Sequence, residues 1–315
     1  MKLSTEIQAK LICPETKRKL YLENGVLVTH ADQVTRYPVV DGIPILINNY
    51  SSIFSVNDFL NRNNTTFDLS ENKLKRIIKR LTPEIGINIS AKGNYRKIVE
   101  ILPDQSKILV VGGSIMGQGM SPIYSNSTFE VIGSDVSFGP HTKIICDAHD
   151  IPFEKDVFDC VIIQAVLEHV LDPHRCVREV TRVLKPQGIV YSETPFMQQV
   201  HMGRYDFTRF THLGHRRLFK DYEEIQSGPT GGPGTVLAWS YLYFLKCFAS
   251  SKLVLSLLTK FAHFTAFFLK YFDYCLNDRP GTYDSASGYF FMGKKSDKCL
   301  SDKELIRQYR GVQKL

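Results

Sequence analysis

The densest set of side chains that could do chemistry lies between residues 196 and 219. Four polar residues fall there within nine positions: His201, Tyr205, Asp206 and Arg209. A histidine titrates near neutral pH and can take a proton from a hydroxyl group, while a nearby carboxylate orients it. The pattern predicts His201 as a general base and Asp206 as its orienting partner. The alternative is that Asp206 and Arg209 pair at a helix start and that His201 caps a loop.

A second candidate pair is Glu168 and His169, which follow closely on an apolar run at residues 158–163. A Glu-His pair at the end of a buried strand can face a ligand, and His169 is the second choice for the base. A histidine beside an apolar helix is also often a satisfied packing residue, so both interpretations stay open.

Glycines and an acid form a third group, at the ends of two apolar runs. Gly112 and Gly113 follow residues 107–111, and Asp135 ends the next run, 23 residues after Gly112. Glycine lets backbone amides approach a ligand closely, and an acid at this separation suits the hydroxyl groups of a ribose. These residues predict a nucleotide-binding core.

Repeated strand-loop-helix units must position these groups. Strands are predicted at residues 107–111, 129–135, 158–163 and 189–195. Asp172 and Pro173 begin a helix whose apolar residues recur at helical spacing, and residues 185–188 end it. The predicted fold class is α/β, a Rossmann-like doubly wound sheet that binds ligands at the carboxyl ends of its strands.

An ordered set of short motifs carries a resemblance to a known family. The set consists of Gly112-Gly113, Asp135, Asp147-Ala148, Ile151-Pro-Phe, Phe158-Asp159, Leu167-Glu-His-Val and Arg182-Val-Leu-Lys-Pro-Gln-Gly. It resembles the class I S-adenosylmethionine-dependent methyltransferases with a type 11-like domain, over roughly residues 90–220 and a strand near 290. In that family the last strand of the sheet is antiparallel.

The resemblance implies a cofactor, S-adenosyl-L-methionine, and roles for particular residues. Gly112 and Gly113 would hold its methionine part, Asp135 its ribose, and Asp147 and Ala148 would lie near its adenine. Gln164, at the end of the predicted strand 158–163, joins these cofactor-binding residues. The sequence departs from the family pattern at three positions: Val110, Ser114 and Gln187.

Composition indicates an ordinary globular protein. Of 315 residues, 43% are hydrophobic and 23% are charged, which excludes disordered and fibrous classes. Seven scattered cysteines without a close pair favour a reducing cytoplasm, and the N-terminus lacks the apolar core of a signal peptide. The net charge of +7 sits partly at residues 73–80 and 294–314, which we interpret as solvated helix faces in preference to phosphate-binding or lipid-binding surfaces.

Residues 1–50 predict a small β-rich unit. It resembles the zinc ribbon of the methyltransferase-activator family through Cys13-Pro-Glu-Thr-Lys and Tyr37-Pro-Val-Val-Asp-Gly-Ile-Pro. A structural zinc site needs four soft ligands, whereas Thr16 stands where the partner of Cys13 is expected and His30 replaces another cysteine. We therefore predict a metal-free ribbon and no metal-binding residues in the protein.

The remaining boundaries follow from composition. Residues 51–100 are predicted as a linker with helices, one near residues 74–81 and one near 95–102. Residues 101–227 form the methyltransferase core, and residues 228–284 an apolar helical insertion that opens with a flexible loop at 228–234. Residues 285–315 supply the last strand and a charged tail.

The apolar insertion is predicted to be a helical hairpin. Lysines at 246, 252, 260 and 270 interrupt it, so that no uncharged segment reaches the ~20 residues that span a bilayer. The hairpin either packs on the core as a lid or lies on a membrane through residues 236–272 with its lysines outward. The corresponding locations are the cytoplasm and the inner face of the membrane.

Three functions remain as hypotheses. The first is a methyltransferase acting on a surface glycan or a lipid-linked precursor, and its acceptor is not identified by the sequence. The second is a non-catalytic partner subunit with the same fold, suggested by Val110 and the ligand-poor ribbon. The third is an RNA methyltransferase, suggested by the net charge. It is disfavoured because no basic stripe with interleaved aromatic residues is evident, so a nucleic acid is not expected as a partner.

Overall fold

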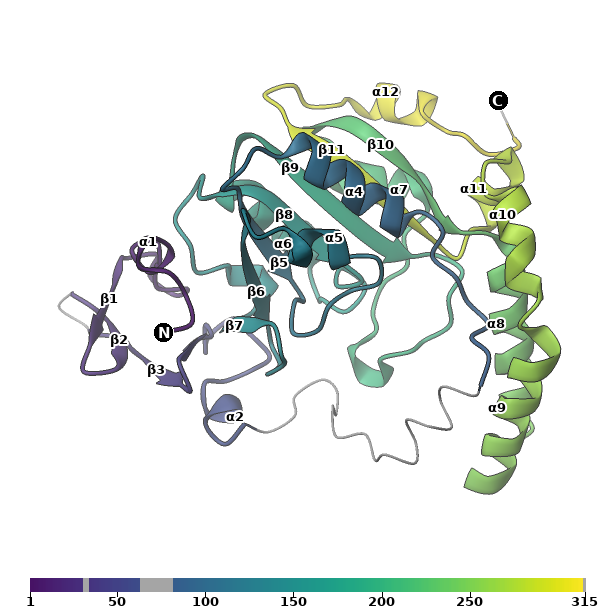
Figure 1. Ribbon diagram of the computed structural model, residues 1–315, viewed down its shortest axis with the longest axis horizontal. Coiled ribbons are helices and arrows are strands. Elements are labelled where there is room, and N and C mark those ends of the chain that lie inside the picture. The colour runs from purple at the N-terminus through teal and green to yellow at the C-terminus, as the bar shows by residue number, and fades with distance from the viewer. Residues whose placement is uncertain (31–33, 63–81, 314–315) are drawn as a thin grey trace.

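A large mixed sheet organises the protein. The computed structural model describes residues 1–30, 34–62 and 82–313 (Figure 1). Five strands run parallel in the centre of the sheet, in the spatial order β7 (Thr142–Cys146), β6 (Glu130–Asp135), β5 (Lys107–Val111), β8 (Phe158–Gln164) and β9 (Leu184–Pro195). The strand β11 (Gly288–Lys295) lies antiparallel between β9 and β10 (Tyr222–Gly231). The predicted Rossmann-like sheet with an antiparallel last strand is confirmed.

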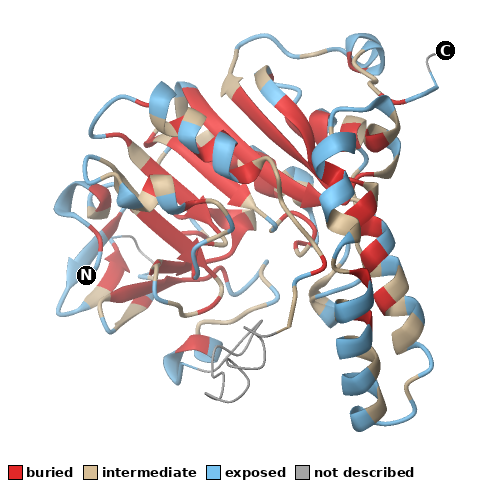
Figure 2. Ribbon diagram, turned by 45° about the vertical axis from the view of Figure 1, so that its right-hand side comes forward, coloured by how far each residue is buried: buried red, intermediate tan, exposed pale blue. Residues whose placement is uncertain are grey.

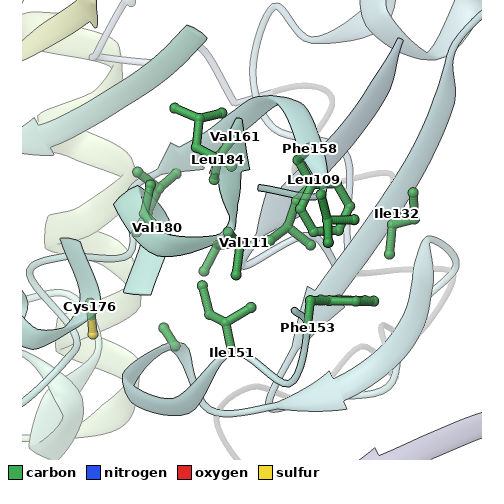
Figure 3. Close-up of a cluster of buried hydrophobic side chains, with 14 of the residues drawn as sticks. Leu109, Val111, Ile132, Ile151, Phe153, Phe158, Val161, Cys176, Val180 and Leu184 are labelled. Atoms are coloured by element: carbon green, nitrogen blue, oxygen red, sulfur yellow. The ribbon is translucent and has the colours of Figure 1, made fainter. Parts of the chain in front are cut away.

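Alternating side chains of the central strands pack on opposite faces of this sheet. Leu109 and Val111 of β5 contact the cluster that includes α6 (Pro173–Val183), shown in part in Figure 3. Ile108 and Val110 contact the cluster of α4 (Ala91–Ile101) on the other face. Both faces are covered, so these strands are apolar throughout, as expected for an interior parallel sheet.

The helix α6 begins as its sequence predicts. The side chain of Asp172 accepts a hydrogen bond from the backbone N–H of Arg175 at 2.9 Å, and Pro173 occupies the first turn, where its missing N–H costs nothing. The helix ends before Leu184, where β9 begins. The predicted helix is confirmed, and it brings the preceding residues 164–171 to the edge of the sheet.

The N-terminal unit continues the same sheet. Its strands β1 (Leu20–Glu23), β2 (Val26–Thr29), β3 (Arg36–Val40) and β4 (Ile43–Leu46) pair in antiparallel order. β4 then pairs in parallel with β7, through Ile45 opposite Ile145 and Leu46 opposite Cys146. A short helix, α1 (Thr5–Gln8), buries Ile7 in the hydrophobic cluster shared with the core. The unit therefore adds strands to the edge of the sheet (Figure 1).

The resemblance of this unit to a zinc ribbon is not confirmed. The Cys13 thiol is buried, lies 3.2 Å from the hydroxyl of Tyr37 and accepts a hydrogen bond from the backbone N–H of Thr16. His30 stacks on Tyr21 and bonds to Glu23 at 2.6 Å in an exposed position. Each candidate ligand thus has protein partners of its own.

The segment after β4 leads through a short helix, α2 (Asn57–Leu60), to residue 62. The helix predicted near residues 74–81 and the basic stretch 73–80 lie outside the described residues. The helix predicted near 95–102 is present as α4.

The flexible loop predicted at residues 228–234 is wrong. Residues 228–231 complete β10, where Gly228 pairs with Phe290 and Gly231 with Gly288, and α8 (Pro233–Lys246) begins two residues later. A Cβ atom on Gly231 would lie 2.5 Å from the carbonyl oxygen of Ile87, so glycine is required here for close backbone packing. Proline is tolerated because β10 is the edge strand of the sheet.

Helices between β10 and β11 form the predicted hairpin. α8 packs against α9 (Lys252–Ala266), which continues through η3 (Leu269–Phe272) and α10 (Asp273–Leu276). Both long helices project away from the sheet and expose most of their outer surface (Figures 1 and 2). Within the described residues, one helical stretch, Lys252–Leu276, is long and apolar enough to cross a membrane by length and composition. Lys260 and Lys270 do interrupt it, as predicted.

The buried carboxylate of Asp273 fixes the base of this hairpin. It accepts hydrogen bonds from the backbone N–H groups of Gly234 at 2.7 Å and Thr235 at 3.0 Å, in the first turn of α8. The chain then passes through α11 (Pro280–Ser285) into β11, and α12 (Asp302–Arg307) follows as a capped surface helix in the charged tail.

Candidate functional site

The ends of β5 and β6 bring the predicted glycines and acid together. Gly112 has φ of +73°, and a Cβ atom there would lie 2.3 Å from Cγ2 of Val166. Two residues later, the backbone N–H of Ser114 donates to Oδ2 of Asp135 at 3.0 Å. Burial raises the pKa of Asp135, which is 8% exposed. The loop and the acid are thus held as one unit at the carboxyl edge of the sheet.

A narrow cavity of about 130 Å³ opens beside this unit. Its walls are mainly apolar and come from both the core and the N-terminal unit: Ile53, Phe54, Val111, Val136, Ala148, Val166, Leu171 and Tyr205. Asp135 and Asp147 are polar groups in the lining. An apolar cavity with acids in its wall suits a purine nucleoside.

Asp147 does not face this cavity with a free carboxylate. The Ser52 hydroxyl donates to its Oδ2 at 2.5 Å, and its Oδ1 lies 2.6 Å from Nδ1 of His149. Burial opposes ionisation, but the hydrogen bonds with His149 hold the pKa of Asp147 below its usual value. Asp147 therefore fastens the wall of the cavity in the absence of a ligand.

The segment that contributes Ser52 was predicted as a linker, and sequence reasoning missed its role. Ser51 and Asn48 both donate to Asp150, at 2.7 and 3.1 Å, and Arg175 of α6 bonds to the same carboxylate. Residues 48–54 are therefore attached to the core by buried and half-buried hydrogen bonds, and Phe54 closes one side of the narrow cavity.

A wider cavity of about 620 Å³ adjoins the narrow one. The two share four lining residues: Gly112, Ala165, His169 and Met202. Polar side chains of the core and aromatic side chains of the hairpin line the wider cavity, among them Asn88, Gln164, Glu193, Gln198, Trp239 and His263. A ligand in each cavity would meet the other beside His169.

Gln164 and Glu193 lie at the ends of neighbouring strands in this wider cavity. Nε2 of Gln164 donates to Glu193 at 2.8 Å, and Asn88 donates to the same carboxylate oxygen at 2.8 Å. Oε1 of Gln164 is buried without a hydrogen-bond partner among the described residues. Sequence reasoning missed Glu193, although an acid within the apolar run 189–195 was a visible signal.

His169 and Glu168 both line the wider cavity. Nδ1 of His169 lies 2.7 Å from the backbone oxygen of Tyr205, which can only accept, so this nitrogen carries the proton of the neutral ring. Burial lowers the pKa of His169. The Glu168 side chain is 1% exposed, and burial raises its pKa to about 8.

His201 lies next to His169, and their ring centres are 4.8 Å apart. Its Nδ1 is 3.3 Å from Oδ2 of Asp206, which also accepts a hydrogen bond from the backbone N–H of His201 at 2.9 Å. Arg209 pairs with both oxygens of Asp206. Although burial opposes it, this pairing holds the pKa of Asp206 well below its usual value. The predicted catalytic residues His169, His201 and Asp206 thus lie together. Asp206 contacts both His201 and Arg209, so both pairs considered in the sequence analysis are present.

The comparisons with known proteins concern the core. Residues 117–192 match the family model described as a methyltransferase domain. No curated protein matches the sequence.

Solved structures share the fold at low identity. The putative sarcosine dimethylglycine methyltransferase of Galdieria sulphuraria is 14% identical, with a TM-score of 0.43 over 66% of this chain and 84% of that one. The phosphoethanolamine N-methyltransferase 2 of Haemonchus contortus is 15% identical, with a TM-score of 0.43 over 66% and 53%. These values carry no argument about the acceptor.

Residues 117–192 thus match a methyltransferase domain, and the sheet that contains them has the Rossmann-like fold of the class I S-adenosylmethionine-dependent methyltransferases. The residues present fit this cofactor. The glycine at position 112 leaves no room for a side chain, and Oε1 of Gln164, a residue in the wall of the wider cavity, is a buried polar atom without a partner among the described residues.

Proposed function

We propose that the protein is a methyltransferase whose acceptor is a hydroxyl group of a lipid-linked glycan precursor. The observation that supports this proposal is the meeting of two cavities at His169. The narrow one has the shape and polarity for a nucleoside, and the wider one opens beside an exposed apolar hairpin.

The chain's own residues supply binding and orientation on the cofactor side. The backbone of Gly112 and Gly113 would border the methionine part, Asp135 would accept from the ribose hydroxyls, and Ala148 would pack on the adenine. Gln164 would pair through its free oxygen. S-adenosylmethionine supplies a methyl group on a positively charged sulfur, so the protein needs mainly to align the reactants and exclude water.

On the acceptor side, His169 and His201 face the place where the reacting atom must lie. Asp206 positions His201 from behind and is itself fixed by Arg209. The amide and carboxylate groups of Asn88, Glu193 and Gln198 suit the hydroxyl groups of a sugar, which both donate and accept hydrogen bonds.

The hairpin supports a lipid-linked acceptor. Large apolar side chains on its outer surface are 49–70% exposed: Phe244, Phe248, Leu253, Leu257, Phe261, Phe264, Phe268, Tyr271, Phe272 and Tyr274. A soluble protein rarely exposes so many together, and lysines at 252 and 260 would meet anionic lipid headgroups. The hairpin would lie on the inner face of the membrane, with Trp239 and His263 reaching into the wider cavity.

The function is tested with purified protein, labelled S-adenosylmethionine and membrane extracts. Label should enter material that partitions with lipids, and release of the glycan from its lipid should carry the label into water. Label found only in protein or RNA would contradict the proposed acceptor.

Membrane attachment is tested separately by flotation with vesicles that contain anionic lipid. Replacing Phe261 and Phe264 by serine should weaken binding by ~10²–10⁴-fold, since burying each phenylalanine contributes roughly 1.5–3 kcal/mol. Ile306→Ser is the matched control, because Ile306 is 67% exposed on α12, outside the hairpin. Equal binding by all three proteins would exclude the hairpin as the membrane contact.

A further inference from the structure

A buried carboxylate without a partner lies at the wall of the wider cavity. Neither Oε1 nor Oε2 of Glu168 has a hydrogen-bond partner among the described residues, although the side chain is 1% exposed. Buried carboxylates are normally hydrogen-bonded, paired with a cation or bound to a metal, because an unpaired charge is costly to bury. The position of Glu168 therefore calls for a partner.

The nearest cationic side chain is already engaged. Arg209 donates to both carboxylate oxygens of Asp206 and to the backbone oxygens of Gln198, Gln199 and Thr208. The backbone oxygen of Glu168 is also used, since it accepts from the N–H groups of Phe207 and Thr208. These contacts fix the backbone at Glu168 and leave its carboxylate facing two imidazoles.

Both imidazoles are arranged as metal ligands usually are. A ligating histidine binds the metal through one ring nitrogen and donates the other N–H to a carbonyl or a carboxylate. Nδ1 of His169 donates to the oxygen of Tyr205, which leaves Nε2 with its lone pair 3.6 Å from Oε1 of Glu168. Nδ1 of His201 lies 3.3 Å from Oδ2 of the Asp206 carboxylate.

We propose that Glu168, His169 and His201 bind a divalent transition-metal ion at the wall of the acceptor cavity. Their ligand atoms lie within 4.8 Å of one another. Three ligands of a tetrahedral zinc ion stand about 3.3 Å apart, at bond lengths of about 2.0–2.2 Å. Closing the site requires a shift of about 1.5 Å at most, which His201 can supply because it lies on an irregular segment and is 29% exposed.

Two histidines and one glutamate leave coordination positions open toward the cavity. A hydroxyl group of the acceptor bound there would lose its proton more easily, because the cation stabilises the oxygen anion. The O–H bond breaks, the oxygen stays on the metal and the proton passes to water in the cavity. This inference rests on the proposed function and replaces His201 as proton acceptor by a metal that His201 helps to hold. It also departs from the expectation, drawn from the sequence, that the protein has no metal-binding residues.

Calorimetry with Zn²⁺ or Mn²⁺ alone tests the site in the full-length protein after treatment with a chelator. We expect one ion to bind per chain, and Glu168→Gln or His169→Gln to weaken binding at least 100-fold. His263→Gln is the matched control, since His263 lines the same cavity outside the cluster. Exposed thiols at Cys247, Cys275 and Cys299 can also bind zinc, so the difference between variants is the measured quantity.

Thermal melting shows whether the variants are folded. Glu168→Gln replaces a buried carboxyl group, whose pKa burial raises to about 8, by a neutral group of the same shape, so without metal the variant should melt at or above the parent temperature. Metal should raise the melting temperature of the parent and leave that of Glu168→Gln unchanged. Equal metal binding by the parent, Glu168→Gln and His263→Gln would overturn the inference.

The two proposals fail in different ways. Methyl transfer that continues at full rate after chelation, in protein that binds S-adenosylhomocysteine, would overturn the metal site and leave the proposed function intact. Stoichiometric metal binding that depends on Glu168, in protein that does not bind S-adenosylhomocysteine, would support the metal site and overturn the proposed function.

Discussion

Replacing Asp135 tests the cofactor site most directly. A carboxylate that accepts from two ribose hydroxyls makes two charge-assisted hydrogen bonds, each contributing roughly 1.5–3 kcal/mol. Asp135→Ala should therefore cost about 3–6 kcal/mol of binding free energy, which corresponds to ~10²–10⁴-fold weaker binding of S-adenosylhomocysteine. Asp135→Asn keeps an acceptor for the N–H of Ser114 and should cost about half as much.

The protein without ligand should tolerate Asp135→Asn, whereas Asp135→Ala also removes the acceptor of the buried Ser114 N–H and should cost roughly 1–3 kcal/mol of stability. Because burial raises the pKa of Asp135, the negative charge of this carboxylate does not stabilise the folded state, and a neutral side chain of the same shape loses no stability through the charge. Asp135→Asn should thus melt near the parent temperature, and the loss of affinity can be assigned to the missing ligand contacts.

Titration calorimetry with S-adenosylhomocysteine measures the effect, and thermal melting gives a second readout. At a ligand concentration 100 times the Kd, binding stabilises the folded state by about 2.7 kcal/mol, and this shift should vanish in Asp135→Ala. Glu130→Gln is the control, since Glu130 begins the same strand at the opposite edge of the sheet. Parent affinity in a folded Asp135→Ala protein would refute the placement of the cofactor.

Three further substitutions test other parts of the molecule. His201→Ala should leave S-adenosylhomocysteine binding intact and lower turnover by ~10²–10⁴-fold in a methyl-transfer assay, and an unchanged rate would make His201 a loop residue. Burial lowers the pKa of His215 to about 3, so below pH ~6.5 the unfolded chain binds a proton at this residue and the folded protein does not. The free energy of unfolding should therefore fall by about 2 kcal/mol between neutral pH and pH 5, and urea unfolding of His215→Gln should lack this decrease. The same dependence of stability on pH in the parent and in His215→Gln would contradict the prediction. Asp273→Ala should destabilise the hairpin by roughly 1–3 kcal/mol, seen as faster proteolysis within α8 and α9, because two buried N–H groups lose their acceptor.

Local sequence signals predicted the core of the fold. Apolar runs that end in glycine or an acid mark β5 and β6, because interior parallel strands are buried on both faces and release polar residues only at their ends. Asp172 and Pro173 mark the start of α6 for an equally local reason, the need to satisfy or omit the first N–H groups of a helix. Such signals depend on neighbours within a few residues and can be read without a structure.

Contacts between distant segments could not be predicted in this way. Residues 228–231 have the composition of a loop, yet they form an edge strand because their small size allows the backbone to approach that of Ile87 and β11. The Glu-His pair at 168 and 169 was visible, but the lack of any partner for the Glu168 carboxylate depends on Arg209 being occupied by Asp206. A sequence shows which side chains are charged, but it does not show which of them have a hydrogen-bond or ion-pair partner.

The parallel pairing of β4 with β7 explains why the N-terminal unit reaches the cofactor cavity. An antiparallel strand at that edge would end at the opposite side of the sheet, far from Asp135. Because β4 runs parallel, its carboxyl end emerges beside that of β7, and six residues after Leu46 the hydroxyl of Ser52 donates to Asp147. The same chain direction places Phe54 in the wall of the narrow cavity. The backbone direction of β4 therefore makes the segment that follows it part of the wall of the narrow cavity.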